Sequence, residues 1–517
     1  MKTKQLAGIF LAATMLLSAC SSPGGGSPSP GTSGPPAERS YKDTVNVVME
    51  REPASLDVVN VSSVPGVLIS DLIFGTLVGK NAQGEIIPEL ATEWTQVDDL
   101  TIRFKLRDDV YFHNGAKFTA EDVKFSLDRG AQKGTTTYSV LQNIESCEII
   151  GEYEVELTLK TPFAPLFNYL ASPSIGAMYC KEYVEQASDD KIAREPIGTG
   201  PFKLANWVPG ASISFDRFEE YWGDLPTYQK LNIKFIAEPT NRTIELETGA
   251  ADIIYNVLPT DMSRIEGDSD LKIEKALSNE FVYFTLNTQD ETLKDIRVRE
   301  AMACALDMQA IVNVAFGADA AIVADSLISP AIVGYKPIEL IEYNPERAKQ
   351  LLKEAGYENG IDLEFSTADI KRFVETIEIA QNMWKNVGIN IVSTDISEMA
   401  TYLDKASRSE VQVGLNAYKP SSGDPDQALA NWSSSRKWEM QCNDPVADQY
   451  LLDGISEYDV EKRKEIYSEA LDYLWDTHYQ IPVAFTYNIY AMSKNVENTE
   501  EFAAVYPADL AKVVVYE

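Results

Sequence analysis

The sequence predicts an α/β protein with more than one lobe. Residues 101–107 and 154–160 alternate charged and apolar side chains, which is typical of half-buried strands. Elsewhere, helix start signals precede apolar residues at helical spacing, most clearly at Asn344-Pro345-Glu346. Strand-like runs lie between such helices, which favours α/β lobes. The chain has 517 residues, which is long for one compact core, so we expect two or three lobes.

The N-terminal segment has the pattern of an export signal. Lys2 and Lys4 precede residues 6–17, an apolar stretch that is too short to span a bilayer as a permanent helix. Small residues then lead into Cys20, and the segment resembles a bacterial lipoprotein signal, in which residues 1–19 are removed and Cys20 carries a lipid such as palmitate. An ordinary secretory signal with a chance cysteine is the alternative. Either signal predicts that the mature chain works outside the cytoplasm.

Residues 20–40 are expected to form a tether that follows the lipidated cysteine. Residues 21–36 are nearly all Ser, Pro and Gly, and such a segment cannot bury enough apolar surface to fold. A tether of this kind holds a folded body at a membrane and leaves it free to sample solvent. A plain flexible N-terminus is the alternative.

Strands dominate the first part of the folded body and helices the second. A first strand is predicted at residues 45–49, and the spacing of Thr119 and Asp122 predicts a capped helix that runs through Leu127. In the second part, residues 298–316 are apolar at helical spacing, and a helix from Asn344 ends at Gly356. Further helices are predicted at residues 374–387 and 461–475, with strands at residues 362–365 and 390–392 between them.

Composition excludes several classes of function. A formal net charge of −34 argues against nucleic acid as a partner; it could favour cationic ligands, although acidic surfaces usually serve solubility. With only His113 and His478, we expect no histidine-based metal site, and no catalytic or cofactor-binding signature is present. His113 is expected in a loop or turn role. Whether Cys147 and Cys180 form a disulfide cannot be deduced from their positions.

Four groups of short motifs occur in the order and spacing of one known family. The groups are Glu89-Leu90-Ala91-Thr92-Glu93-Trp94 with Phe112-His113-Asn114-Gly115; Gly198-Thr199-Gly200-Pro201-Phe202 with Glu220-Tyr221-Trp222-Gly223; Asp295-Ile296-Arg297-Val298-Arg299-Glu300-Ala301-Met302 with Ala305-Leu306-Asp307; and Tyr343-Asn344-Pro345-Glu346-Arg347-Ala348-Lys349 with Glu354-Ala355-Gly356-Tyr357. Together they resemble the family 5 extracellular solute-binding proteins of ABC importers, the oligopeptide- and dipeptide-binding group, over about residues 44–515.

The resemblance implies a two-lobe periplasmic-binding-protein type II fold with an extra domain inserted in lobe I. Lobe I would take residues 41–82, 196–282 and 483–517, the inserted domain residues 83–195, and lobe II residues 283–482. The ligand would be enclosed between the lobes by hinged closure, and the closed form would dock on a permease.

Candidate ligand-binding residues lie within residues 411–438, which are rich in Gly, Ser, Asp and aromatic side chains; they are Tyr418, Ser421, Asp424 and Trp432. The resemblance implies that peptide-binding relatives hold a peptide's amino terminus with an aspartate just before a Gly-Asp-Pro-Asp run. Ser421 stands at that place in this chain, which puts dipeptide-style recognition in doubt, because a buried ammonium needs a carboxylate.

Asp424 has two candidate roles. It is a tempting ammonium ligand, yet Asp424-Pro425-Asp426 also has the pattern of a helix start, with Asp424 as the N-cap. We favour the cap. On that interpretation Asp424→Asn keeps most of the stability and binding, whereas Asp424→Ala costs about 1 kcal/mol of stability.

Three functions are therefore weighed. The first is a lipid-anchored, monomeric receptor of an ABC importer for peptides, with permease subunits and, through Cys20, the membrane as partners. The second is the same receptor for another solute such as an oligosaccharide, for which Tyr418 and Trp432 would offer stacking faces. The third, least favoured, is an extracytoplasmic enzyme or assembly protein on this scaffold.

Overall fold

The computed structural model describes residues 39–60, 64–81, 84–434, 443–499 and 509–517. The chain divides into two units, Met1–Ser40 and Tyr41–Glu517, and every element below belongs to the second. The predicted signal peptide, Cys20 and most of the tether lie outside the described residues. Within the described residues, no helix combines the length and the apolar character that a membrane span requires.

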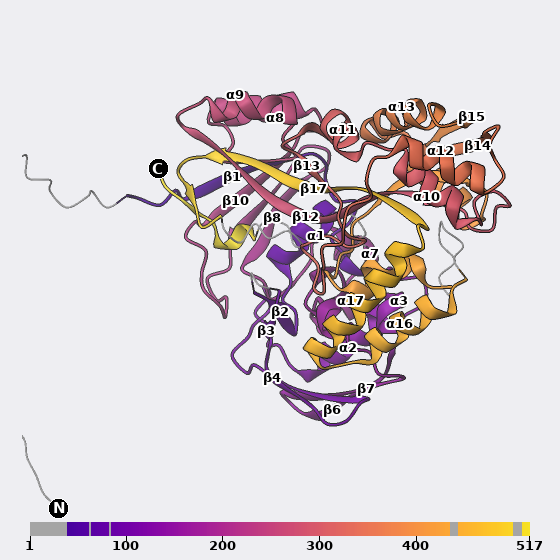
Figure 1. Ribbon diagram of the computed structural model, residues 1–517. Helices are drawn as coiled ribbons and strands as arrows, with labels where there is room; N and C mark the ends of the chain where they lie inside the picture. Colours follow the sequence, from indigo (N-terminus) through magenta and orange to yellow (C-terminus); the bar gives the residue numbers. More distant parts are fainter. Residues whose placement is uncertain (1–38, 61–63, 82–83, 435–442, 500–508) are drawn as a thin grey trace, which may run out of the picture. The chain divides into compact units, whose positions relative to one another are not determined.

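A mixed sheet of 11 strands runs through most of the folded unit (Figure 1). Its strand order is β15-β14-β16-β12-β17-β11-β1-β10-β9-β8, and β13 pairs with β17 beside this path. The strands are β1 (Thr44–Met49), β8 (Phe202–Val208), β9 (Ser212–Arg217), β10 (Lys230–Phe235), β11 (Ile253–Tyr255), β12 (Leu271–Leu286), β13 (Ala321–Val323), β14 (Ile361–Ala368), β15 (Ile389–Ser397), β16 (Val413–Tyr418) and β17 (Gln480–Ser493).

Two long strands, β12 and β17, join the two halves of this sheet. At one end β17 pairs with β11, and at the other end β12 pairs with β16, while the two strands pair with each other along most of their length. The ladder between them shifts register between Leu277 and Phe281, so Ser278, Asn279 and Glu280 form a bulge. A bulge bends a strand and redirects its side chains, which places these three polar residues at the junction of the halves.

The strand β1 anchors the start of the folded unit. It lies between β10 and β11 and is parallel to both. Just before it, Tyr41 bridges to Tyr516, and the Lys42 amide donates to the Val515 carbonyl at 2.7 Å. The two ends of the described unit therefore meet beside the same half of the sheet. A short pair, β18 (Val496–Glu497) and β19 (Val514–Val515), completes this corner.

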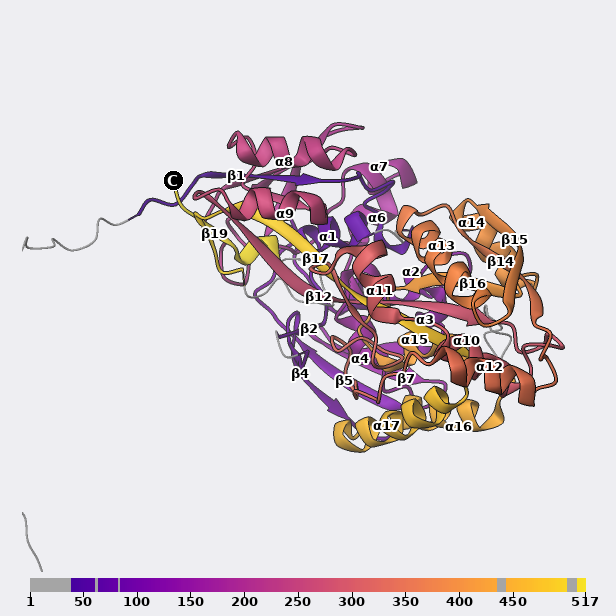
Figure 2. The ribbon, with the colours of Figure 1, turned by 45° about the horizontal axis from the view of Figure 1, so that its top comes forward.

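A second, antiparallel sheet lies within the predicted inserted domain. Its order is β4-β5-β7-β6, with β4 (Ala91–Gln96), β5 (Thr101–Leu106), β6 (Ile144–Gly151) and β7 (Glu154–Leu159), and the pair β2 (Val78–Lys80) and β3 (Ile86–Pro88) precedes it. Alternate residues of β5 and β7 are buried, as the sequence predicts. Figures 1 and 2 both place this sheet beside the helices α16 and α17.

Several separate apolar cores occupy the folded unit. One core centres on β1 and its neighbours and includes Val47 and Ile253, a second fills the antiparallel sheet around Phe104, and a third surrounds Trp384 in the other half of the large sheet. The Trp384 indole nitrogen donates to the Met302 carbonyl at 2.9 Å, so this buried ring leaves no polar group unsatisfied. The exact boundaries of the lobes and of the inserted domain stay predictions.

Helices cover the sheets (Figure 2). Those of the first half and of the predicted inserted domain are α1 (Val64–Ile73), α2 (Ala120–Gly130), α3 (Tyr138–Leu141), α4 (Leu166–Leu170), α5 (Pro173–Gly176), α6 (Lys181–Gln186), α7 (Asp189–Arg194), α8 (Pro239–Glu247) and α9 (Pro259–Glu266). Those of the second half are α10 (Ile296–Cys304), α11 (Met308–Val312), α12 (Pro345–Glu354), α13 (Lys371–Lys385), α14 (Met399–Ser407), α15 (Pro425–Ala428), α16 (Pro445–Ser456) and α17 (Val460–Asp476).

The capping signals are confirmed where they were clearest. The Asp122 carboxylate accepts the Thr119 amide at 2.9 Å ahead of α2, and the Asn344 carboxamide accepts the Arg347 amide at 3.0 Å ahead of α12. The apolar run at residues 298–316 is a different case. It is divided into α10, which ends at Cys304, α11 and a π-helical turn (Asn313–Gly317), and Asp307 caps α11 by accepting the Ala310 amide.

The fold answers the open question of a disulfide and shows the surroundings of His113. Cys147 and Cys180 are both buried free thiols, and burial raises the pKa of Cys147 to about 12. His113 lies in a turn, as expected, and packs against the Gly198–Gly200 segment. Its Nε2 is 3.0 Å from the Gly200 carbonyl, and its Nδ1 accepts the Gly198 amide at 3.4 Å.

Candidate functional site

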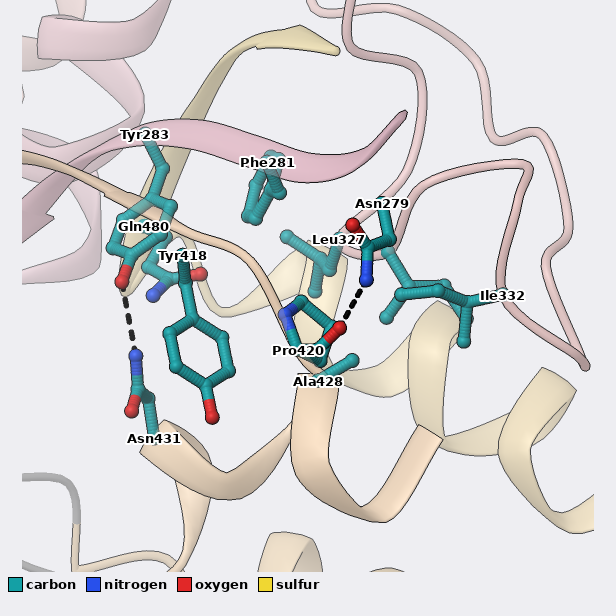
Figure 3. Close-up of a pocket in the computed structure, with 11 residues that line it drawn as sticks. Asn279, Phe281, Tyr283, Leu327, Ile332, Tyr418, Pro420, Ala428, Asn431 and Gln480 are labelled. Carbon is teal, nitrogen blue, oxygen red and sulfur yellow. Dashed lines mark hydrogen bonds between the residues drawn. The ribbon is translucent and has the colours of Figure 1, made fainter. Parts of the chain in front are cut away.

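A small cavity lies where the bulge of β12 meets the end of β16 (Figure 3). Its volume is about 10 Å³, which is room for one water molecule. A solute can therefore enter only if the surrounding segments move. The lining combines aromatic and aliphatic side chains with three carboxamides: Asn279, Phe281, Tyr283, Leu327, Ile328, Ile332, Tyr418, Pro420, Ala428, Asn431 and Gln480.

The carboxamide of Asn279 has spare hydrogen-bonding capacity. Its nitrogen donates to the Pro420 carbonyl, whereas its buried oxygen has no hydrogen-bond partner among the described residues (Figure 3). A buried acceptor without a partner costs about 1–3 kcal/mol, so a donor at this position would be favoured. By contrast, the Asn431 nitrogen donates to the Tyr283 hydroxyl at 2.9 Å.

Asp424 is the N-cap of α15, as favoured from the sequence. Its carboxylate accepts the Asp426 amide at 2.9 Å. The same carboxylate is 0% exposed and forms a bidentate ion pair with Arg463, with N–O distances of 2.6 and 2.7 Å. Asn168 donates to it at 2.6 Å. Burial alone would raise the pKa of Asp424, but the Arg463 guanidinium and these donors hold that pKa below its usual value.

This environment corrects the expectation for Asp424→Asn. An N-cap exchanges Asp for Asn at little cost when the side chain is exposed, and that was the basis of the expectation. Here each carboxylate oxygen accepts two donors, and Arg463 needs the negative charge. The asparagine would leave a buried guanidinium without its counter-charge, which is strongly destabilising.

The other candidate residues differ in how far they are enclosed. Tyr418 lines the cavity and is half-buried. Ser421 is half-buried, and its hydroxyl lies 3.4 Å from the Gln427 carboxamide oxygen. Trp432 is 1% exposed, and its ring packs at 5.8 Å from the ring of Tyr479, so neither of its faces is open to solvent in this conformation. Residues 435–442, including Trp438, lie outside the described residues.

The loop after β16 also contacts the first part of the chain. The Lys80 ammonium donates to the Ser422 carbonyl at 2.6 Å, and the Tyr169 hydroxyl donates to Asp426 at 3.2 Å. Burial lowers the pKa of Lys80 to about 8, although the Asp424 charge opposes this shift. Together with the Asn168 contact, these bonds hold the loop after β16 against the first part of the chain.

A second polar cluster lies at the bulge, around Glu280. Arg372, from the first turn of α13, binds the Glu280 carboxylate with N–O distances of 2.7 and 3.0 Å, and Thr486 donates to the same carboxylate at 2.7 Å. The Lys419 ammonium donates to the Asn488 carboxamide oxygen at 3.0 Å. Burial lowers the pKa of Lys419, the Glu280 charge acts in the opposite direction, and Arg372 adds to the lowering.

Sequence reasoning missed Lys80, Glu280, Arg463 and Lys419. None of them lies in a motif, and each is brought to the site by tertiary structure. For Lys419 a signal was available, because it lies between the candidates Tyr418 and Ser421. Among the described residues, no group of three or more His, Cys, Asp or Glu side chains is arranged to hold a metal ion.

Comparisons with known proteins agree with this architecture. The profile of the bacterial extracellular solute-binding proteins, family 5, matches residues 85–440. The glutathione-binding protein GsiB of Salmonella paratyphi A is 28% identical over 422 residues, which cover 79% of this chain and 82% of the relative.

Solved structures share the fold. HbpA2 from Haemophilus parasuis superposes with a TM-score of 0.84 at 24% identity, covering 92% of this chain and 100% of that one. DppA from Helicobacter pylori, in complex with the peptide STSA, superposes with a TM-score of 0.77 at 23% identity, covering 92% and 99%. With a family profile matched over more than half of its length, the chain belongs to the family 5 bacterial extracellular solute-binding proteins, which are non-enzymatic components of ABC importers, and it has the type II periplasmic-binding-protein fold.

Proposed function

We propose that this chain is the membrane-anchored receptor of an ABC importer, which captures peptides by hinged closure and delivers them to a permease. The observation that carries the proposal is the position of the candidate site. The site lies at a bulge between β12 and β17, the two strands that join the described halves of the large sheet, so movement of one half against the other would change the cavity. The names of the relatives, which bind glutathione or a peptide, support a peptide-like solute.

Closure is proposed from the contacts across the junction. Hydrogen bonds join Lys80, Asn168 and Tyr169 to the loop after β16, and the Ala164 amide donates to the Ile455 carbonyl at 2.8 Å. These bonds would break on opening and form again on closing. A solute would favour the closed state only by the difference between its affinities for the two states.

We assign the candidate residues different roles. Tyr418 and Ser421, with Asn279, would face the solute once the cavity opens. Asp424 and Trp432 are enclosed, so they would stabilise the loop after β16 and would not contact the solute. Residues 1–19 would be removed as a signal peptide, Cys20 would carry the lipid, and residues 20–40 would act as the tether.

A non-peptide solute such as an oligosaccharide is the second candidate. The observation that favours it is the absence of a carboxylate at Ser421, where peptide-binding relatives are expected to hold an ammonium. The half-buried ring of Tyr418 would then supply a stacking surface.

Mass spectrometry of solute released from the purified protein tests the proposal. A peptide or peptide-like molecule is expected, and a sugar would favour the second candidate. Solution scattering of the emptied protein should then show a smaller radius of gyration after the same solute is added back. Tight binding with an unchanged radius would contradict hinged closure.

A further inference from the structure

We propose that the turn between α16 and α17 is a latch, which joins the second half of the molecule to the predicted inserted domain and favours the closed state in the absence of solute. The latch consists of Ile455 and Tyr458, and it contacts the inserted domain at Asp99, Phe163 and Ala164. The inference rests on the hinged closure proposed above, and it assigns a role to the inserted domain.

Hydrogen bonds join the turn to the backbone of the inserted domain. The Tyr458 hydroxyl accepts the Phe163 amide and donates to the Asp99 carbonyl, both at 3.1 Å. The Ile455 carbonyl accepts the Ala164 amide at 2.8 Å. Asp99 lies between β4 and β5, and Phe163 follows β7, so one hydroxyl binds two segments at the antiparallel sheet. The turn therefore docks at a defined position on this sheet.

Contacts within the second half of the molecule hold the turn in shape. Asp459 caps α17 by accepting the amides of Glu461 and Lys462 at 3.1 and 3.0 Å. Arg463 donates to the Gly454 carbonyl at 2.7 Å. These bonds do not involve the inserted domain, so they would persist when the junction opens. A preorganised turn loses little conformational entropy when it docks, which favours a contact that forms and breaks repeatedly.

The interface is narrow, as a reversible contact requires. Among the described apolar side chains of α16 and α17, only Ile455 packs against the core around Phe104. Buried residues of these helices such as Leu451 and Leu471 belong to a separate core with Tyr283. Bonds to water replace neutral hydrogen bonds on opening, so each latch bond adds only modestly to the stability of the closed state. Relative motion of the two parts is therefore expected.

The latch is separate from the cavity. Neither Ile455 nor Tyr458 belongs to the residues that line it. By contrast, Asn168 and Tyr169 bond to the loop after β16, which contributes Pro420 to the lining. Closure through the latch consequently needs no solute, and a solute then binds a state that is already populated. The apparent affinity rises with that populated fraction, by the same factor for every solute.

Hydrogen exchange of the emptied full chain, resolved to single residues by mass spectrometry, tests the latch. Tyr458→Phe removes the hydroxyl and keeps the ring. The reporter is the Ala164 amide, because its partner is the Ile455 backbone carbonyl, which the substitution leaves in place. This amide should exchange about tenfold faster in Tyr458→Phe than in the wild type, whereas amides of β5 should not change. Ile455→Ala, which removes the apolar contact, should act in the same direction.

Tyr450→Phe is the matched control, because Tyr450 lies on α16 and its ring packs at 6.1 Å from the ring of Tyr473 within the second half. Melting curves show whether each variant folds. Solution scattering of the emptied proteins should give a larger radius of gyration for Tyr458→Phe than for the wild type and the control.

Unchanged exchange at Ala164 in Tyr458→Phe would overturn the latch, and so would an equal acceleration in Tyr450→Phe. Faster exchange with an unchanged radius would indicate local fraying and would also count against it. Exchange at Ala164 as slow as in β5 in every protein would mean that the two parts are joined permanently, which contradicts a latch. None of these results removes the receptor role, because the solute released from the purified protein tests that role separately.

Discussion

Replacing Asp424 with asparagine should destabilise the second half of the molecule severely, although the change adds no bulk. The wild-type carboxylate accepts four hydrogen bonds, two at each oxygen, from Arg463, Asn168 and the Asp426 amide. In the variant, one oxygen becomes an NH₂ group that faces two donors. The guanidinium of Arg463, whose side chain is 11% exposed, also loses its counter-charge.

The magnitude follows from the burial of the pair. Breaking a buried, hydrogen-bonded ion pair by removing one partner costs about 3–5 kcal/mol, whereas losing a helix cap alone costs about 1 kcal/mol. Arg463→Met should cost a similar amount, because it leaves the Asp424 carboxylate buried. The double variant Asp424→Asn/Arg463→Met removes both charges, so its cost should be well below the sum of the two single costs.

Hydrogen exchange measured by mass spectrometry suits this test, because a chain of several lobes need not unfold in one step. Peptides from α15 and α17 should lose protection in Asp424→Asn, while peptides from β4–β7 should change much less. Glu461→Gln is the control, because Glu461 lies on α17 and pairs with Lys464 at an exposed site, where ion pairs contribute little.

Two results would refute this reasoning. One is a loss of about 1 kcal/mol or less in Asp424→Asn, which would mean that the carboxylate acts only as a cap. The other is a double variant as unstable as the two single changes added together, which would mean that Asp424 and Arg463 do not act as a pair.

Three further predictions concern other parts of the chain. Burial lowers the pKa of His113 to about 4, so as the pH falls the unfolded chain takes up the proton before the folded chain does. The free energy of unfolding should therefore decrease by up to about 3 kcal/mol between pH 6.5 and pH 4. His113→Gln should remove this part of the pH dependence, and the same pH dependence in both proteins would contradict the prediction. Ser421→Asp should weaken binding of the solute released from the protein by burying a new, unpaired carboxylate beside the solute; tighter binding would indicate a solute with an ammonium there. Cys20→Ala should abolish incorporation of radiolabelled palmitate, and equal labelling of both proteins would exclude Cys20 as the lipid site.

The sequence predicted most of what depends on neighbours along the chain. The caps of α2 and α12, the alternation in β5 and β7 and the cap at Asp424 each follow from a few consecutive residues. The prediction of the fold as a whole rested on the order of the motifs along the chain and not on any single element. The break before α11 was missed, because the apolar pattern continues through it, although Asp307 was its signal.

The site was less predictable, because its chemistry depends on partners that are far apart in the chain. Arg463 follows Asp424 by 39 residues, and Arg372 follows Glu280 by 92. Nothing in the local sequence of either residue indicates its partner. The residue types at positions 418–424 could be read in advance, but which of them are already paired, and which remain available to a solute, depends on the tertiary structure.

The placement of β1 has a mechanical consequence. Any tension on the segment before Tyr41 passes into a strand that is hydrogen-bonded on both edges to parallel neighbours. Such a pull acts along the strand, so the bonds to β10 and β11 resist it together in shear and are not peeled apart one after another. The half of the sheet that contains β1 therefore bears the load first, and the load reaches β17 only through β11, and β12 only through β17. A receptor held by its amino-terminal end could thus be dragged against a surface without its solute-binding junction being forced open.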